Sequence, residues 1–229
     1  MEKKVIVISL GGSLIIPEKV DYSFLKKFKK VILRNAKKNK FVIVCGGGSI
    51  ARKYIHALQQ EKAKTLLQSF AGISATRMNA RFMSYFFNKD SSIGIPHTLE
   101  TLEKYLEKEK IVFCGALEYK PNQTSDSTSA EIAMHFKTEF INMTNVPGLY
   151  DKNPMEHKDA KFIPKIGWED FHKMAIKKKF TPGQHFVLDQ TAAKIIMKHK
   201  IPTYILGKNL KELENLLKGR KFKGTTIEG

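Results

Sequence analysis

The sequence predicts an α/β fold with a largely parallel sheet. Short runs rich in Val, Ile and Phe alternate with amphipathic segments along the whole chain, which is typical of strands and helices that follow one another in turn. Two of these runs end directly in glycine turns. No internal repeat, low-complexity tract or linker interrupts the alternation, so we expect the 229 residues to form one continuous sheet domain.

Each element of the first half rests on its local pattern. Residues 22–38 carry apolar side chains at helical spacing and follow Asp21, a residue type that favours helix N-caps. Gly72 is a candidate break in a long helical segment. The predicted elements are, in order, strand 4–9, helix 22–38, strand 41–45, helix 49–60, helical segment 63–88, a short strand near Ile93, helix 99–109 and strand 111–115.

The second half continues the same alternation, with longer polar loops between the elements. A helix opened by Asp126 follows the first of these loops. The remaining predicted elements are strand 140–143, helix 168–176, helix 188–199, strand 203–206, helix 210–217 and a last strand, "GTTI", over 224–227.

The charge of the chain points to anionic partners. Lys and Arg number 40 against 22 Asp and Glu, a formal net charge of +18, and such a balance favours polyanions. The lysines are spread through helix-like segments without interleaved aromatic residues or a nucleic-acid motif. A solvated lysine-rich surface and an anionic small-molecule substrate such as a nucleotide both explain the charge, and we do not expect a nucleic-acid partner.

Composition also bears on compartment and metal content. No run approaches the roughly 18 apolar residues of a membrane span, so we expect neither a membrane segment nor export. Cys45 and Cys114 each end an apolar run and are interpreted as reduced core thiols of a cytoplasmic protein. The seven histidines show no metal-ligand spacing, and no structural metal is predicted.

Two glycine turns form the strongest site signal. "VISLGGSLI" places Gly12 and Ser13 after the first strand, and "VCGGGSIARKYI" places three glycines after the second, with Arg52 one helical turn further on. Glycine lets backbone N–H groups approach an anion, and a helix N-terminus favours phosphate. The Lys-Ser/Thr pair of a P-loop is absent. A plain tight turn is the alternative for either motif alone.

Three polar segments add candidate ligand groups. They lie in "NQTSDSTSAE", "MTNVPGLYDKNP" and "FVLDQTAAKII", each next to a predicted strand or helix. Ordinary helix caps and turns are the alternative explanation. The candidate residues are Thr124, Ser125, Asp126, Thr144, Asn145, Tyr150, Asp151, Asn153, Asp189 and Lys194.

Taken in order, these motifs resemble the amino acid kinase superfamily, and most closely the UMP (uridylate) kinases of archaeal type. The resemblance runs from end to end of the chain. The motifs that carry it are "LGGS" (10–13), "GGGSIARKYI" (46–55), "GISATRMNA" (72–80), "TSD" (124–126), "TNVPGLYDKNP" (144–154), "LDQTAAKII" (188–196) and "GTTIE" (224–228).

The resemblance implies a three-layer αβα sandwich with an amino acid kinase-like fold. It implies an N-terminal acceptor-binding lobe over about 1–140 and a C-terminal ATP-binding lobe over about 141–229. The implied reaction transfers a phosphoryl group from Mg-ATP to UMP in pyrimidine nucleotide biosynthesis, in a cytoplasmic homohexamer. The Mg²⁺ is expected to be held mainly by the phosphates, with Asp126 or Asp189 nearby.

The resemblance also assigns roles residue by residue. Catalysis falls to Arg52, Asp126 and Asp189. The residues implied for ATP are Gly12, Ser13, Gly48, Arg52, Thr144, Asn145, Tyr150 and Asn153. The residues implied for UMP are Gly47, Ser69, Asn122, Gln123, Thr124 and Ser125.

Several positions depart from the family pattern and keep two alternatives open. Ser69 stands where the archaeal enzymes place an acid expected to contact uridylate, and Asn153 replaces the acid of "Y-x-x-D-P", with Asp151 as a stand-in. The loop "GALEYKPNQTSD" is longer than its family counterpart and lacks its histidines. One alternative is a family member with a different phosphate or carboxylate acceptor, and the other is a catalytically weak nucleotide-binding protein.

Overall fold

The fold is built on a seven-stranded sheet in the order β3-β2-β1-β4-β8-β9-β7. The computed structural model describes residues 3–90, 92–121, 123–177 and 188–229. The first five strands of that order run parallel, β9 is antiparallel to β8, and β7 is parallel to β9. The strands are β1 (Lys4–Leu10), β2 (Asn39–Cys45), β3 (Ile111–Cys114), β4 (Phe140–Met143), β7 (Lys165–Ile166), β8 (Thr203–Leu206) and β9 (Thr225–Ile227).

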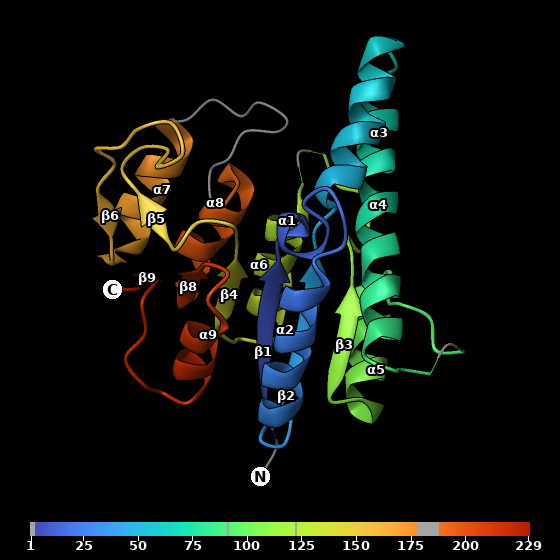
Figure 1. Ribbon diagram of the computed structural model, residues 1–229, viewed down its shortest axis with the longest axis horizontal. Coiled ribbons are helices and arrows are strands. Elements are labelled where there is room, and N and C mark those ends of the chain that lie inside the picture. The colour runs from blue at the N-terminus through green and yellow to red at the C-terminus, as the bar shows by residue number, and fades with distance from the viewer. Residues whose placement is uncertain (1–2, 91, 122, 178–187) are drawn as a thin grey trace.

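Helices cover both faces of the sheet, which confirms the predicted three-layer sandwich. Because strand side chains alternate, Ile6 and Ile8 of β1 belong to one hydrophobic cluster and Val7 to the other. In Figure 1, α2 lies in front of the sheet and α6 behind it. The first cluster includes side chains of α1 (Gly12–Ile15), α2 (Tyr22–Asn35), α4 (Thr65–Phe86) and α9 (Leu210–Leu217), and the second those of α5 (Leu99–Lys108), α6 (Ser125–His135), α7 (Trp168–Lys177) and α8 (Gln190–His199).

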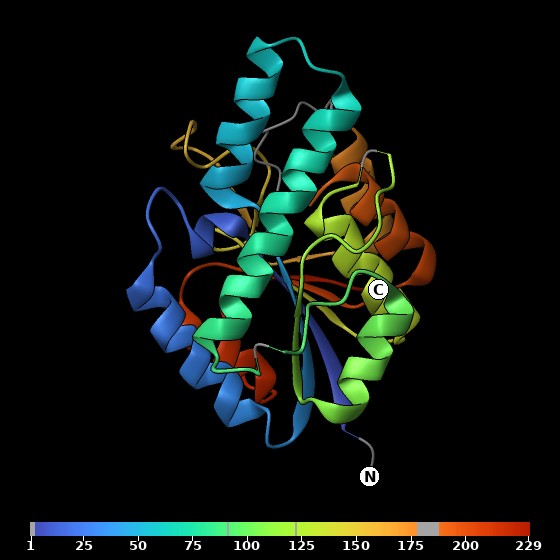
Figure 2. The same ribbon diagram turned by 90° about the vertical axis from the view of Figure 1, so that its right-hand side faces the viewer.

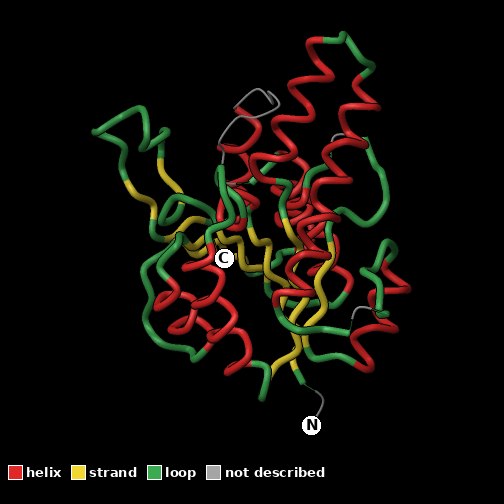
Figure 3. The backbone as a smooth tube through the Cα atoms, turned by 45° about the vertical axis from the view of Figure 1, so that its right-hand side comes forward, coloured by secondary structure: helices red, strands yellow, loops and turns green. Residues whose placement is uncertain are grey.

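Two further features stand out from the sandwich. Helix α3 (Gly48–Gln60) packs along α4, and the pair projects beyond the sheet (Figure 2). On the other side, β5 (Leu149–Tyr150) and β6 (Phe162–Ile163) form a small antiparallel arm with a long loop (Figure 3). No helix in the described ranges is long and apolar enough to cross a membrane.

The carboxyl ends of the parallel strands gather at one edge of the sheet. The Gly11 N–H donates to the carbonyl of Met143 at 2.9 Å, and the Gly46 N–H donates to that of Leu10 at 2.9 Å. These bonds continue the sheet pairing past the ends of β1, β2 and β4. The loops after the three strands are therefore fixed beside one another.

The structure corrects three local predictions. No strand forms over residues 92–98, where the Ile93 N–H bonds to the Asp90 carbonyl in a turn and Pro96 lacks a donor. Gly72 does not break α4, because packing against α3 outweighs its low helix propensity. Helix α2 ends at Asn35, since the chain turns there through a bond from the Lys38 N–H to the Asn35 carbonyl.

Candidate active site

The two glycine turns touch backbone to backbone at the carboxyl edge of the sheet. A Cβ atom added to Gly12 would lie 2.0 Å from the Gly48 nitrogen, and one added to Gly46 would lie 2.5 Å from the Gly12 nitrogen. Gly48 also has a φ of +62°, which favours glycine. The predicted pair of turns is therefore a single structure in which no side chain fits between the two loops.

The N-terminus of α3 opens onto this contact and suits an anion. The first turn of a helix leaves backbone N–H groups without intrahelical partners and carries a partial positive charge. Ser49 lies in that turn, is 2% exposed, and its hydroxyl has no hydrogen-bond partner among the described residues. A buried hydroxyl without a partner is costly unless a ligand completes it, so Ser49 joins the candidate phosphate groups.

Arg52 lies one turn further along α3, where its side chain is exposed. No salt bridge of Arg52 is found in the described part of the chain, whereas the neighbouring Lys53 pairs with Glu18 at 2.9 Å. The guanidinium of Arg52 is thus available to an anion. A guanidinium can bind a phosphate group through two parallel hydrogen bonds, which is a strong interaction.

A carboxylate, Asp126, stands beside the glycine turns. Its Oδ1 accepts a hydrogen bond from the Ser9 hydroxyl of β1 at 2.8 Å. Loss of hydration and the nearby charge of Asp189 raise the pKa of Asp126 to about 7, while the Ser9 hydrogen bond acts in the opposite direction. A carboxyl group with such a pKa changes its charge near neutral pH.

The structure corrects the prediction that Asp126 opens α6. Thr124 is the N-cap, with its hydroxyl accepting from the Asp126 N–H at 3.1 Å, and Ser127 completes a capping box by accepting from the Thr124 N–H. A Thr side chain at that position satisfies the first helical donors. Asp126 is thereby left free to face Ser9 from within the first turn.

Asp189 is the N-cap of α8 and ties that helix to α6. Its Oδ1 accepts from the Ala192 N–H at 2.8 Å, and its Oδ2 accepts from the hydroxyls of Ser127, at 2.8 Å, and Thr124. Both carboxylate oxygens are therefore engaged by the protein. The hydrogen bonds assign Asp189 to positioning Thr124 and the start of α6.

Helix α4 contributes residues that the sequence reasoning did not single out. The Asn79 amide donates to the Gly46 carbonyl at 2.7 Å, and the Arg77 guanidinium donates to the carbonyls of Ala116, at 3.0 Å, and Leu117. These bonds fix one glycine turn and the loop after β3 on the same helix. The only sequence signal was their place in "GISATRMNA".

Other predicted residues lie at the ends of β4 and in the β5–β6 arm. Thr144 directly follows β4, and its N–H donates to the Leu206 carbonyl at the end of β8 at 2.9 Å. Its hydroxyl donates to the Asn145 side chain at 3.2 Å. Tyr150 packs edge-on against Phe162, with ring centroids 5.4 Å apart. A nucleotide bound over this edge would meet these groups beyond the glycine turns.

A few predicted residues are engaged elsewhere or are not described. The Ser69 hydroxyl donates to the Thr65 carbonyl one turn earlier in α4, at 3.0 Å. The Asn153 side chain accepts from the Met155 N–H at 3.1 Å, and that of Asp151 accepts from the Lys161 N–H at 2.8 Å, so both hold the arm's loop. Asn122 lies outside the described residues.

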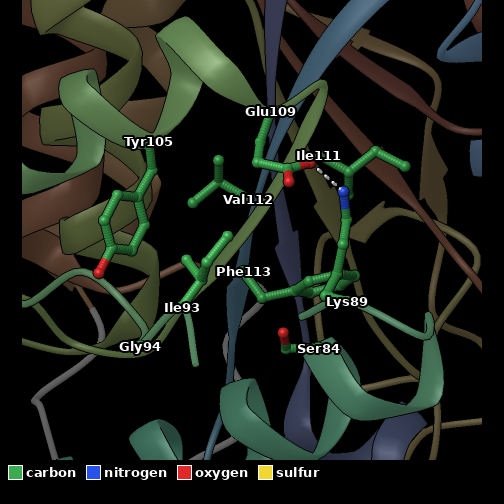
Figure 4. A pocket seen from close by; sticks show the side chains of 9 residues that line it. All are labelled: Ser84, Lys89, Ile93, Gly94, Tyr105, Glu109, Ile111, Val112 and Phe113. Carbon is green, nitrogen blue, oxygen red and sulfur yellow. Dashed lines mark hydrogen bonds and ion pairs between the residues drawn. The ribbon is translucent and has the colours of Figure 1, made fainter. Parts of the chain in front are cut away.

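A small separate cavity lies away from this edge. It is about 20 Å³ in volume, room for roughly one water molecule, between α4, α5 and the start of β3. Figure 4 shows the ion pair between Lys89 and Glu109 across it. It is too small for a substrate. In the described ranges, no group of three His, Cys, Asp or Glu residues could hold a metal ion.

The backbone contact predicts a sharp contrast between two glycine substitutions. Gly12→Ala should lower the free energy of unfolding by roughly 3 kcal/mol or more, because its methyl group would overlap the Gly48 backbone. Gly72→Ala should be neutral or stabilising by up to about 1 kcal/mol, since its nearest contact is 3.5 Å away within a helix. Thermal unfolding of both variants tests this, and equal melting temperatures would contradict it.

The comparison with known proteins identifies the family of the chain. The amino acid kinase family matches residues 4–207. A uridylate kinase of Thermoplasma volcanium is 34% identical over 224 residues, which cover 97% of each chain. A uridylate kinase of Methanocaldococcus jannaschii is 33% identical over 98% of this chain and 99% of its own.

A solved structure of a further uridylate kinase has a similar fold. The crystal structure of uridylate kinase from Archaeoglobus fulgidus matches with a TM-score of 0.83 and 29% identity, over 97% of this chain and 99% of that one. The family match covers nearly the whole chain, and it includes both glycine turns and the Asp126 and Asp189 carboxylates. The chain therefore belongs to the amino acid kinase family.

Proposed function

We propose that the chain is a UMP kinase that transfers the γ-phosphoryl group of Mg-ATP to UMP, giving UDP and ADP. The observation that carries the proposal is the direct contact between the two glycine turns, which would bring two phosphate cradles together. The two near full-length relatives named above are both uridylate kinases, and their names supply the acceptor. The expected setting is pyrimidine nucleotide biosynthesis in the cytoplasm.

The two substrates would approach from opposite halves of the chain. We assign the acceptor to the lobe over about 1–140, with Gly47, Gln123, Thr124 and Ser125 around the UMP phosphate. ATP would lie over the lobe formed by about 141–229, with Thr144, Asn145 and Tyr150 around the nucleotide. Gly12, Ser13, Gly48 and Arg52, where the lobes meet, would face the transferred phosphoryl group.

The reaction needs positioning and charge neutralisation more than covalent help from the protein. An oxygen of the UMP phosphate forms the new bond to the γ-phosphorus as the bond to the bridging oxygen of ADP breaks. Because a phosphate monoester has a second pKa of about 6, the attacking phosphate oxygen of UMP is already anionic at neutral pH. A general base is not required, and backbone N–H groups and Arg52 offset the charge.

Magnesium fits this site as an ion held mainly by substrate. Both oxygens of Asp189 accept hydrogen bonds from the protein, whereas among the described residues Asp126 has a partner on Oδ1 alone, the Ser9 hydroxyl. One free carboxylate oxygen beside the phosphates is an ordinary protein contribution to a Mg²⁺ site. When bound, the ion would neutralise charge on the phosphates, and Asp126 is the protein group that would help to hold it.

The acceptor is the part of the proposal most in need of a direct test. Ser69 offers a hydroxyl, engaged within α4, where related enzymes carry an acid. ATP consumption should therefore be measured against UMP, CMP, AMP, GMP and a set of small carboxylates and carbamates. Turnover with UMP far above the others supports the proposal. Turnover only with a non-nucleotide acid refutes it, and ATP binding without turnover favours a binding protein.

The projecting α3–α4 pair supports a homo-oligomer, which we propose to be a hexamer. Several of its large apolar side chains are 43% to 52% exposed, an arrangement typical of interfaces. They include Tyr54, Leu66, Leu67 and Phe70. Light scattering should give six times the chain mass of 26.1 kDa; a monomer at micromolar concentration would contradict the proposal.

Arg52→Ala should lower kcat/KM at least roughly tenfold, because it removes a cation from the transferred phosphoryl group. The matched control is Lys53→Ala, the next residue of α3, whose ammonium group pairs with Glu18. That variant should keep nearly full activity and the same melting temperature. Equal kinetics for the two variants would remove Arg52 from the site.

Asp126→Asn tests the pKa of about 7. In the wild type, kcat/KM should rise with pH through about 7 as Asp126 ionises, and Asn should abolish that step and slow the reaction. Folding raises the pKa of Asp126, so between pH 4 and 7 the native state holds the extra proton and stability falls as pH rises.

The melting temperature supplies an independent readout of the same group. The wild type should lose stability relative to Asp126→Asn between pH 4 and pH 8, since Asn keeps the shape without the buried charge. If the melting temperatures of the two proteins changed with pH in the same way across this range, Asp126 would have an ordinary pKa.

A further inference from the structure

The sheet edge opposite the active site carries a hollow of about 900 Å³. It lies where β1, β4 and β8 begin, near the N-terminal end of the described chain, whereas the glycine turns lie at the far ends of the strands (Figure 1). Its apolar lining comes from Val5, Met134, Phe136, Ile201 and Pro202. The volume lies within the ~300–1,000 Å³ of small-molecule sites.

Basic side chains dominate the polar lining of this hollow. Lys3, Lys4, Lys137, Lys200 and His199 line it, against a single acid, Glu139, which pairs with Lys4 at 3.0 Å. In the described part of the chain, neither Lys137 nor Lys200 pairs with a carboxylate. Three lysines are therefore left without a balancing charge.

Lys3 also faces further cations at the same edge. Partial loss of hydration lowers the pKa of Lys3, and the charges of Lys110 and Lys40 lower it further. These two lysines stand just before β3 and near the start of β2. Because the strands are parallel, their lysine-bearing starts gather side by side, and the cations repel one another unless an anion lies among them.

The backbone at two of the lysines is unusual. Lys137 and Lys200 have φ values of 48° and 49°, left-handed conformations that favour glycine or asparagine. Each follows the last turn of a helix, α6 or α8. A cation is favourable there, but a lysine at a neighbouring position with ordinary backbone angles would interact with the helix end equally well. Two lysines therefore occupy positions better suited to glycine, and both line the hollow.

We propose that this hollow binds a small anion that carries two or more phosphate groups on an apolar body. The lysines would contact the phosphates, and the apolar lining would cover the rest of the molecule. A concave site of this size favours a small molecule over a nucleic-acid duplex, which needs phosphate contacts spread over several base pairs. The proposal is independent of the reaction at the glycine turns.

The test measures the binding of inorganic tripolyphosphate by calorimetry to the full chain and to the double variant Lys137→Gly/Lys200→Gly. The active site also attracts phosphates, so stoichiometry is the readout. The wild type should bind two equivalents and the double variant one, with the affinity at the lost site reduced roughly tenfold or more. Orthophosphate should bind the hollow more weakly than tripolyphosphate.

Lys62→Gly is the matched control. Lys62 has a φ of 52° just after α3, outside the hollow, so its replacement removes one positive charge and one left-handed lysine, the same change that each member of the double variant makes. It should bind two equivalents, like the wild type. All three glycine substitutions should leave the melting temperature equal or higher, and UMP kinase kinetics should be unchanged, which separates lost binding from lost folding.

Two results would overturn the proposal. The first is the same stoichiometry and affinity in the wild type and the double variant. The second is a 20-base-pair RNA duplex that binds the wild type and not the double variant while tripolyphosphate binding stays unchanged, which would assign the lysines to nucleic acid.

Discussion

The structure depends on the contact between two glycine turns at the ends of neighbouring parallel strands. Phosphoryl transfer requires the attacking oxygen to come within about 3–3.5 Å of the phosphorus, so two phosphate cradles cannot be separated by the thickness of a side chain. Gly12 and Gly48 bring their two turns into contact through backbone alone, as the proposed reaction would require. Asn79 holds the Gly46 carbonyl beside this contact, and Asp126 bonds to Ser9 near the end of β1.

Hydrogen bonds between distant parts of the chain hold the surrounding elements. Ser9 of β1 binds Asp126 of α6, and Thr124 binds Asp189 of α8, so three elements far apart in sequence meet at one edge. The two carboxylates differ in what remains free. Each oxygen of Asp189 accepts at least one hydrogen bond from the protein and so positions its neighbours, whereas Oδ2 of Asp126 has no partner among the described residues. Burial and the charge of Asp189 raise the pKa of Asp126 to about 7, so this carboxyl group changes its charge near neutral pH.

The main elements of the fold were predictable because each is long enough for its apolar residues to show a helical or strand period. Helix α1 spans four residues, and β5, β6 and β7 span two each, which is too short for any periodic pattern to appear. The strand expected near Ile93 was wrong for the related reason that a few apolar residues can occupy a turn. The glycine turns were visible in the sequence because three consecutive glycines after a strand have few other uses.

Roles that arise from tertiary contacts were not predictable from local patterns. Asn79 and Arg77 matter because α4 passes beside the Gly46 turn and the loop after β3, and nothing in their own surroundings in sequence indicates this. Ser69 and Asn153 show the reverse case. Their positions in the family pattern predict ligand contacts, which stay predictions, and in the structure their side chains bond to nearby backbone groups, as short polar side chains often do.

The same parallel topology explains why the carboxyl edge of the sheet suits anions without many basic side chains, whereas the amino edge needs added cations to bind them. Helices that follow parallel strands begin at the carboxyl edge, where their positive N-termini face the substrates, and they end at the amino edge, where their carbonyl groups carry partial negative charge. Phosphate binding at the glycine turns, as proposed, would therefore need few cations, chiefly Arg52. At the amino edge the carbonyl ends of the helices disfavour an anion, so the proposed site there would depend on lysines such as Lys3, Lys137 and Lys200. These lysines supply part of the formal charge of +18 at an edge where the helix ends themselves supply no positive charge.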